Sequence, residues 1–270
     1  MREDEILFRL PEWSIAVTLA VVLLVVVELA RRYGRRDFDR FGAAEEDSAS
    51  LSGASLGLLA LLLAFTYSVA SDHFDLRKQL VLKEANAIGT AFLRTDFTPD
   101  PQRTELQALL RSYTDARVGF SDAGLDAARH AAMLRETDRL QAAIWSAALR
   151  TVRERTSTPL DALLFEALND VIDVHSERLR AQRDHVPEIV ILLLIAAAIA
   201  SVGMLGYAAG RKGDRQQWFR SILPVLIVGV ITLIIDLDRP RSGFILVSQQ
   251  PLLDLQASLH AAATPSAGAK

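Results

Sequence analysis

The chain has 270 residues, of which 50% are hydrophobic and 23% are charged, with a formal net charge of −3 and no cysteine. The charges are segregated, because four stretches that total 74 residues contain a single charged side chain, Glu28. This segregation argues against a single water-soluble domain and against an intrinsically disordered chain. The lack of cysteine excludes disulfides and thiolate metal sites, and the near-neutral charge gives no reason to expect nucleic acid as a partner. The four stretches are Ser14–Ala30, Leu51–Ala70, Ile189–Gly210 and Ser221–Ile235.

Each stretch is predicted to be a membrane-spanning helix. A helix rises about 1.5 Å per residue, so about 20 apolar residues cover the roughly 30 Å hydrocarbon core of a bilayer. The first helix, about residues 13–30, reaches this length when the interfacial Trp13 and Tyr33 are counted. The fourth is the shortest and contains Pro224, which permits a kinked or shallow helix.

Two alternatives to these membrane helices are less favoured. Two buried hairpins of a soluble protein would need apolar helices of unusual length. A cleaved signal peptide at the first stretch would carry its basic residues before the apolar run, whereas here the cluster from Arg31 to Arg36 follows it.

The predicted fold is all-α, with four transmembrane helices and a helical-bundle insert between the second and the third. Residues 1–50 contain an N-terminal tail, the first helix and a basic loop, and residues 51–70 form the second helix. The extramembrane insert occupies residues 71–188. The third and fourth helices, joined by a short basic loop, occupy residues 189–235, and a charged exit motif with a C-terminal tail occupies residues 236–270.

The placement of Lys and Arg predicts the orientation. The loop from Arg31 to Ser50 contains five of these residues and the loop from Arg211 to Arg220 contains four, whereas the two terminal tails, together longer, contain five. The positive-inside rule therefore places both short loops in the cytoplasm, and the insert with both termini outside it. The arginines of the insert are discounted because long domains translocate largely regardless of charge.

The insert is predicted to be helical throughout. Phe74, Val81 and Ile88 recur every seven residues, so the second membrane helix is expected to continue beyond the bilayer as one rod that stops near Pro99. No strand-like alternation of useful length occurs, which favours a helical bundle. Three further helices are expected to begin at Asp100-Pro101, after the break at Gly119–Gly124, and at Thr158-Pro159.

Catalytic motifs are absent from the sequence. It contains no G-x-S-x-G elbow, no H-E-x-x-H pair and no phosphate-binding glycine loop. The five histidines fall at no metal-ligand spacing, and each is interpreted as an ordinary surface or boundary residue. We therefore expect no enzyme activity, no cofactor and no metal site.

Two glycine pairs point to helix packing. Gly53 and Gly57 form a G-x-x-x-G pair on the second helix, and Gly206 and Gly210 form another on the third. Small residues at this spacing let helix backbones approach closely, which is a main source of association in lipid. The alternative is that membrane helices are rich in glycine in general.

Along the second helix the side chains change from hydroxyl-bearing to apolar and then back to hydroxyl-bearing. Hydroxyl groups at Ser52 and Ser55 precede the apolar run Leu58–Phe65, and Tyr67 and Ser68 follow it. Hydroxyls at both ends of an apolar constriction are what a water-accessible pore with a hydrophobic gate needs. Alternatively, these hydroxyls bond their own helix backbone and other interface groups.

A charged exit motif follows the fourth helix. It contains Asp236, Asp238, Arg239 and Arg241, with a turn fixed by Pro240 and the nearby glycine. Such a set could form a charged ring, an ion-coordination site or a salt-bridged lock onto the insert. It could also be a membrane-exit turn whose charges are simply solvated.

Two sequence signatures resemble a family of bacterial membrane proteins of unknown function that are labelled bestrophin-like. The match extends from the first membrane segment to about Leu255, and it implies an inner-membrane, multi-pass protein. The first signature contains ASLGLL at 54–59, LAFTYS at 63–68, DHFDLR at 72–77 and EANAIGT at 84–90, and the second is DLDRP at 236–240 with Gly243.

A more distant likeness is to the true bestrophins, which are oligomeric anion channels whose second membrane helix lines the pore and forms an apolar neck. This resemblance implies that Leu58, Leu62, Phe65 and Ser68 face a pore. Two features differ from the bestrophins. No charged or asparagine pair follows Phe65, and the orientation given by the basic loops is opposite, since the corresponding region between the second and third helices of bestrophins is cytoplasmic.

The leading hypothesis is a homo-oligomeric ion channel that conducts along its second helix, with Asp236 and Asp238 near one mouth. The bestrophin resemblance implies anions, whereas acidic residues at a mouth favour cations. The competing hypothesis is a non-conducting sensor or scaffold whose insert binds a partner. The expected partners are the lipid bilayer, further copies of the chain and inorganic ions.

Overall fold

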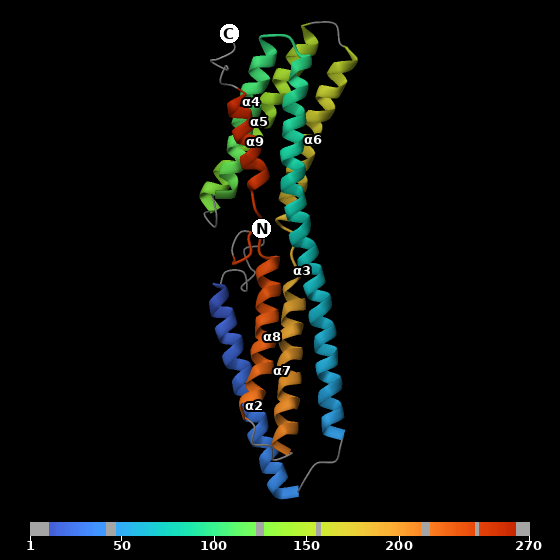
Figure 1. Ribbon diagram of the computed structural model, residues 1–270, viewed down its shortest axis with the longest axis vertical. Coiled ribbons are helices and arrows are strands. Elements are labelled where there is room, and N and C mark those ends of the chain that lie inside the picture. Colours follow the sequence, from blue (N-terminus) through green and yellow to red (C-terminus); the bar gives the residue numbers. More distant parts are fainter. Residues whose placement is uncertain are drawn as a thin grey trace, which may run out of the picture. The chain divides into compact units, whose positions relative to one another are not determined.

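All regular secondary structure in the described part of the chain is helical, as the sequence predicts (Figure 1). The computed structural model describes residues 11–41, 47–122, 127–154, 158–211, 217–240 and 243–262. The helices are α2 (Glu12–Phe41), α3 (Asp47–Arg94), the short 3-10 helix η1 (Thr95–Phe97), α4 (Gln102–Asp122), α5 (Ala127–Arg153), α6 (Pro159–Ala181), α7 (Glu188–Arg211), α8 (Gln217–Asp238) and α9 (Gln250–Ala261).

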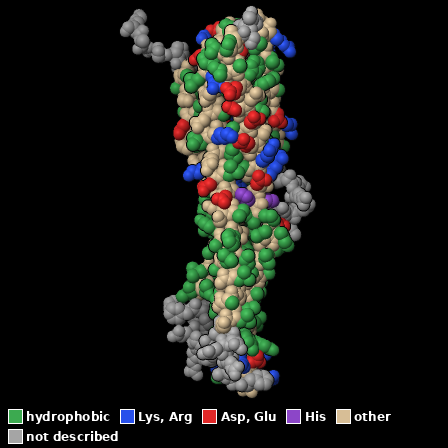
Figure 2. All heavy atoms as spheres, turned by 90° about the vertical axis from the view of Figure 1, so that its right-hand side faces the viewer, with side chains coloured by type: hydrophobic (Ala, Val, Ile, Leu, Met, Phe, Trp, Pro, Cys, Tyr) green, Lys and Arg blue, Asp and Glu red, His purple; other side chains and the backbone are tan. Residues whose placement is uncertain are grey.

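Four helices are long and apolar enough to cross a membrane, which confirms the prediction of four transmembrane helices. The candidate spans are Trp13–Arg40, Ser50–Phe97, Glu188–Arg211 and Ser221–Asp238. Figure 2 shows one face of the protein, on which hydrophobic side chains cover the membrane helices and charged side chains gather over the insert.

The chain divides into two compact units. The first unit contains residues 1–74, 185–239 and 243–245, and the second contains residues 75–184, 240–242 and 246–270. The α3 helix contributes its N-terminal part to the first unit and its C-terminal part to the second.

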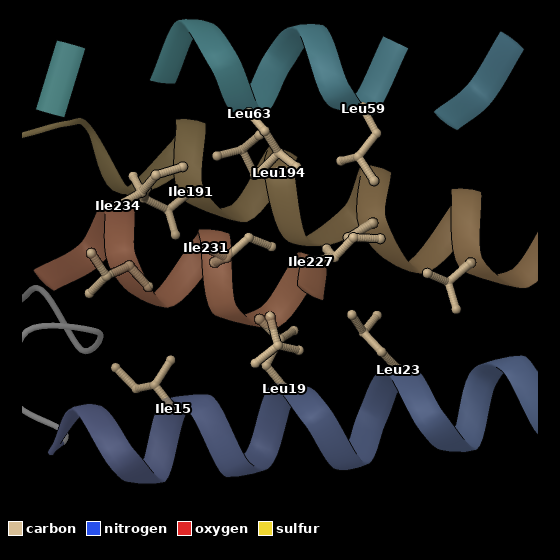
Figure 3. Close-up of a cluster of buried hydrophobic side chains, with 14 of the residues drawn as sticks. Ile15, Leu19, Leu23, Leu59, Leu63, Ile191, Leu194, Ile227, Ile231 and Ile234 are labelled. Atoms are coloured by element: carbon tan, nitrogen blue, oxygen red, sulfur yellow. The ribbon is translucent and has the colours of Figure 1, made fainter. Parts of the chain in front are cut away.

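The first unit has an apolar core to which each membrane helix contributes one stripe (Figure 3). On α2 the stripe repeats every four residues, because 3.6 residues per turn bring such positions to the same face. The α8 stripe has spacings of four and three, and α3 contributes two leucines that point toward α7. The stripes are Ile15, Leu19 and Leu23 on α2, Leu59 and Leu63 on α3, Ile191 and Leu194 on α7, and Ile227, Ile231 and Ile234 on α8.

Helices α2 and α7 approach so closely that only glycine fits at their contact. A methyl group on Gly206 would lie 2.5 Å from the carbonyl oxygen of Val27, and one on Gly210 would overlap the carbonyl oxygen of Arg31. Gly34 of α2 meets the backbone of α7 in the same way. The second of the two G-x-x-x-G pairs therefore lies in a close contact between helices of one chain.

Helix α2 is longer than the sequence predicts, because it continues to Phe41 where a loop was expected from Arg31 onward. Two local features support the extension. Glu28 forms ion pairs of 2.7 and 2.8 Å with Arg31 and Arg32, at the i+3 and i+4 positions that favour a helix. One turn beyond, Asp37 accepts a hydrogen bond of 2.9 Å from the Tyr207 hydroxyl of α7.

The second unit is a bundle of the C-terminal part of α3 with α4, α5, α6 and α9. Val81 and Ile88, the heptad residues of α3, are buried in its core. Helix α6 begins with a capping box, in which Thr158 and Asp161 satisfy each other's backbone N–H groups. The other helices contribute Leu106, Leu110 and Tyr113 on α4, Leu140 and Ile144 on α5, Leu164, Leu168 and Val171 on α6, and Leu252 and Leu259 on α9.

The sequence analysis missed α9, which lies in the segment that was described only as a C-terminal tail. Leu252 and Leu259 are buried against the bundle, and Arg111 of α4 donates a hydrogen bond of 3.0 Å to the carbonyl oxygen of Leu259. A helix of 12 residues is marginal in isolation, so packing against α4 is what stabilises it.

The close α2–α7 contact predicts that Gly206→Ala destabilises the protein. The added methyl group meets a backbone carbonyl, which cannot rotate away, so the helices must separate at a cost of about 1–3 kcal/mol. Gly229→Ala on α8 is the matched control, because a methyl group there meets no atom within 4 Å. Thermal unfolding in detergent should show a lower midpoint for Gly206→Ala alone, and equal midpoints would contradict the contact.

Candidate pore face and charged exit motif

One face of α3 is packed within the first unit and the opposite face is not. Leu58 is 58% exposed and Phe65 is 64% exposed, and Ser68 lies on the same side of the helix and is also exposed. Leu62, the remaining pore candidate, is half-buried and packs against the apolar core. Three of the four residues therefore share an exposed face, and Leu62 lies at its inner edge.

The hydroxyl groups of α3 fall into two sets. Ser55 donates a hydrogen bond of 2.6 Å to the hydroxyl of Ser201 on α7, and Thr66 donates one of 2.8 Å to the carbonyl oxygen of Leu62 on its own helix. These groups follow the alternative interpretation, in which hydroxyls satisfy backbone and interface groups. The hydroxyl group of Ser68, in contrast, makes no hydrogen bond to any described residue, and it remains a polar group on the exposed face.

Gly53 and Gly57 differ from the glycine pair on α7. A methyl group on either residue would meet no described atom within 4 Å. Within the described part of the chain the α3 pair is therefore open, and it is available for close packing at this spacing.

Asp72 extends the exposed face of α3 beyond Ser68. It lies four residues after Ser68 and seven after Phe65, which places all three on the same side of the helix. Its side chain is exposed and makes neither a hydrogen bond nor an ion pair with the residues that the structure describes. The sequence analysis did not single out Asp72, although its spacing from the pore candidates was visible.

The two aspartates of the charged exit motif are buried. Asp236 is 3% exposed, and its two carboxylate oxygens accept hydrogen bonds from the backbone N–H groups of Phe244 at 2.8 Å and Ile245 at 3.1 Å. This carboxylate therefore ties the end of α8 to the segment at Phe244 and Ile245.

Asp238 ties the end of α8 to two other segments. It is 1% exposed, and it accepts a hydrogen bond of 2.8 Å from the backbone N–H of Val186, just before α7. Its other oxygen lies 3.1 Å from Nδ1 of His73 on α3. These contacts favour the interpretation of the charged exit motif as a lock between segments over that of a turn whose charges are solvated. Arg239 is buried as well, and Arg241 lies outside the described residues.

The second unit contains a buried ionic cluster that the sequence analysis did not predict, although its carboxylate, Glu84, is the first residue of the EANAIGT signature. Glu84 of α3 is fully buried between Arg117 of α4, whose Nε donates a hydrogen bond of 2.6 Å, and Arg178 of α6, which donates to the other carboxylate oxygen. His175, one turn before Arg178, is buried beside them, whereas a surface or boundary position was expected. Burial and the charge of Arg117 lower the pKa of His175 to about 4.

The buried imidazole predicts a pH-dependent stability. The unfolded chain binds a proton at His175 near pH 6.5, whereas the folded protein does so only near pH 4, so the folded state loses stability as the pH falls between these values. The loss amounts to about 3 kcal/mol at 1.36 kcal/mol for each pKa unit. His175→Leu should flatten the dependence of the thermal midpoint on pH between 6.5 and 4.5.

An exposed residue that does not titrate, Gln79 of α3, provides the control for this measurement. Gln79→Leu should leave the slope of the thermal midpoint against pH unchanged. A wild-type slope that persists in His175→Leu would show that another group is responsible.

The arrangement matches known proteins in family and in fold. A family model described as a Bestrophin-like domain matches residues 15–252. Two crystal structures of a bacterial bestrophin homologue from Klebsiella pneumoniae share the fold. One, a tyrosine-to-alanine variant, has a TM-score of 0.69 at 13% identity and covers 91% of this chain and 97% of its own. The other, a leucine-to-threonine variant, has a TM-score of 0.70 at 15% identity and covers 92% and 98%. None of the curated proteins matches the chain.

Proposed function

Because the chain belongs to the bestrophin-like family, we propose that it is an oligomeric ion channel in which the exposed face of α3 lines the conduction path. The observation that carries this proposal is the position of Leu58, Phe65 and Ser68 on one side of a membrane helix that packs against the core with its other side. The bestrophin-type architecture supports a channel over an enzyme.

A pore along α3 requires several copies of the chain. One helix cannot enclose a path, so the α3 helices of neighbouring copies must face one another. Gly53 and Gly57 are available for close packing between copies, because nothing in the described part of the chain covers them. The mass of the detergent-solubilised complex separates this proposal from the competing sensor or scaffold, since a monomer would end the channel hypothesis.

Phe65 is proposed to form the narrowest apolar ring of the path. Large apolar side chains at a constriction oppose the entry of water and ions. Ser68 and Asp72, which follow on the same face, provide a polar continuation of the path.

Phe65→Ala is therefore expected to raise ion flux several-fold in reconstituted liposomes, because it widens the constriction. Leu226→Ala, at an exposed position of α8, is the control, and its flux should equal that of the wild type. Unchanged flux in Phe65→Ala, measured in a preparation that conducts, would remove α3 from the conduction path.

Two hypotheses concern the charge of the permeant ion, an anion or a cation. The bestrophin resemblance suggests anions. The exposed carboxylate of Asp72 on the proposed pore face favours cations instead, because a ring of carboxylates attracts positive ions. Asp236 and Asp238 contribute less to this choice, because both carboxylates are buried and bonded to backbone N–H groups.

Reversal potentials under a salt gradient distinguish the two. If Asp72 sets the selectivity, Asp72→Asn should shift the reversal potential toward lower cation preference, whereas Asp173→Asn at an exposed position of α6 should not. An anion-selective wild type with an unchanged reversal potential in Asp72→Asn would support the anion channel.

The channel is proposed to reside in the bacterial inner membrane. The basic residues at the α2 end near Phe41 and at the α7 end near Arg211 favour a cytoplasmic location for these ends. The insert and both termini would then lie outside the cytoplasm.

A further inference from the structure

We propose that the side of α2 turned away from α7 binds a phospholipid whose headgroup carries a net negative charge. This side presents an exposed aliphatic stripe for the acyl chains, followed by an exposed basic stripe for the phosphate. The aliphatic stripe consists of Val21, Val25 and Leu29. The basic stripe consists of Arg32, Arg36 and Arg40. The inference concerns a helix other than the proposed pore helix and does not depend on conduction.

The contact with α7 fixes which side of α2 faces outward. Gly34 lies against the backbone of α7, since a methyl group on it would overlap the carbonyl oxygen of Tyr207. Successive residues of a helix are about 100° apart, so Arg32 and Arg36, two positions before and after Gly34, lie about 160° away from this contact. Spacings of three and four residues carry the same side along both stripes. The core residues of α2 point inward (Figure 3).

The two stripes meet where α2 leaves the hydrocarbon core. Counted from the interfacial Trp13, about 20 residues at 1.5 Å each bring the helix to Tyr33, and both aromatic side chains are exposed. The basic stripe is therefore at the level of the headgroups, and the aliphatic stripe is at the level of the acyl chains. Aliphatic and basic surfaces in line match the two parts of an anionic phospholipid.

Positive charge is in excess around the basic stripe. The segment from Glu28 to Phe41 contains five arginines and three carboxylates, and Arg211 at the adjoining end of α7 adds one more positive charge. Two of the carboxylates are already engaged. Glu28 forms ion pairs within α2, and Asp37 accepts the hydrogen bond from Tyr207. The net charge at this end of the two helices favours an anionic headgroup over a zwitterionic one.

The basic stripe also has free hydrogen-bond donors. Arg36 and Arg40 are exposed, as is Arg35 beside them, and none of the three forms a hydrogen bond or an ion pair with a residue that the structure describes. A guanidinium carries five N–H groups in a planar fork that matches the oxygens of a phosphate. These side chains can therefore bind a headgroup without giving up a contact within the described part of the chain.

A lipid titration of the protein in detergent tests the ligand class. Because a ligand that binds only the folded state raises its stability, dioleoyl phosphatidylglycerol should raise the thermal midpoint by a few degrees and then saturate. Dioleoyl phosphatidylcholine has the same acyl chains without the net charge, so it should have a smaller effect at the same concentration. Equal shifts with the two lipids would overturn the proposal.

The double variant Arg36→Gln, Arg40→Gln tests the location. The phosphatidylglycerol concentration that gives half of the shift should rise about 25-fold, at about fivefold for each arginine near a lipid headgroup. The matched control, Arg135→Gln with Arg153→Gln, removes the same charge from exposed positions of α5 and should respond as the wild type does. A wild-type response in the Arg36→Gln, Arg40→Gln variant would reject this site.

A single introduced cysteine tests the position of the acyl chains. The chain contains no cysteine, so Leu29→Cys provides one labelling site for a fluorophore. In liposomes with a fixed fraction of brominated lipid, brominated phosphatidylglycerol should quench this fluorophore more than brominated phosphatidylcholine does. Val225→Cys, at an exposed position of α8, is the control, and there the two lipids should quench equally.

Two outcomes of the quenching measurement would reject the proposal. Equal quenching at Leu29→Cys would show that no lipid is preferred there, and no quenching by either lipid would show that a second copy of the chain covers this side of α2. Because neither measurement requires conduction, a negative result leaves the proposed channel unaffected, and a failure to conduct leaves this site unaffected.

Discussion

Backbone hydrogen bonding in lipid is the constraint on which the rest of the structure depends. An N–H or C=O group without a partner costs several kcal/mol in the hydrocarbon core, so the chain crosses it only as helices. The same requirement returns where the helices end. There, Asp236 and Asp238 accept hydrogen bonds from backbone N–H groups of Phe244, Ile245 and Val186, which have no helical partner. The two aspartates of the charged exit motif therefore serve first to satisfy backbone N–H groups next to the ends of the membrane helices.

The two faces of α3 meet different demands. Leu59 and Leu63 fill the core of the first unit, and this packing fixes which side of the helix remains open. The open side carries Leu58, Phe65, Ser68 and Asp72, and a carboxylate in line with apolar residues suits an aqueous path better than lipid, where an unpaired charge is expensive. Family and fold support a bestrophin-type channel architecture, and the open face of α3 is the basis of the proposal that copies assemble to form the path.

Buried charge organises the second unit in a comparable way. Glu84 holds α3 to α4 and α6 through Arg117 and Arg178, and breaking such a pair is strongly destabilising because it leaves an uncompensated charge. The cluster fixes the three helices together.

The sequence alone determined the all-helical class, the four spans and the long α3 helix, because apolar length and helical period are local properties of the chain. It also brought Leu58, Phe65 and Ser68 to one side of α3, since 3.6 residues per turn require it. Only the tertiary structure decided that Leu62 packs inward, that Gly206 but not Gly57 is enclosed, that Asp238 is buried and that α9 forms. Each of these outcomes depends on a partner far away in the sequence, such as Val27 for Gly206 and Val186 for Asp238, and local patterns carry no information about such partners.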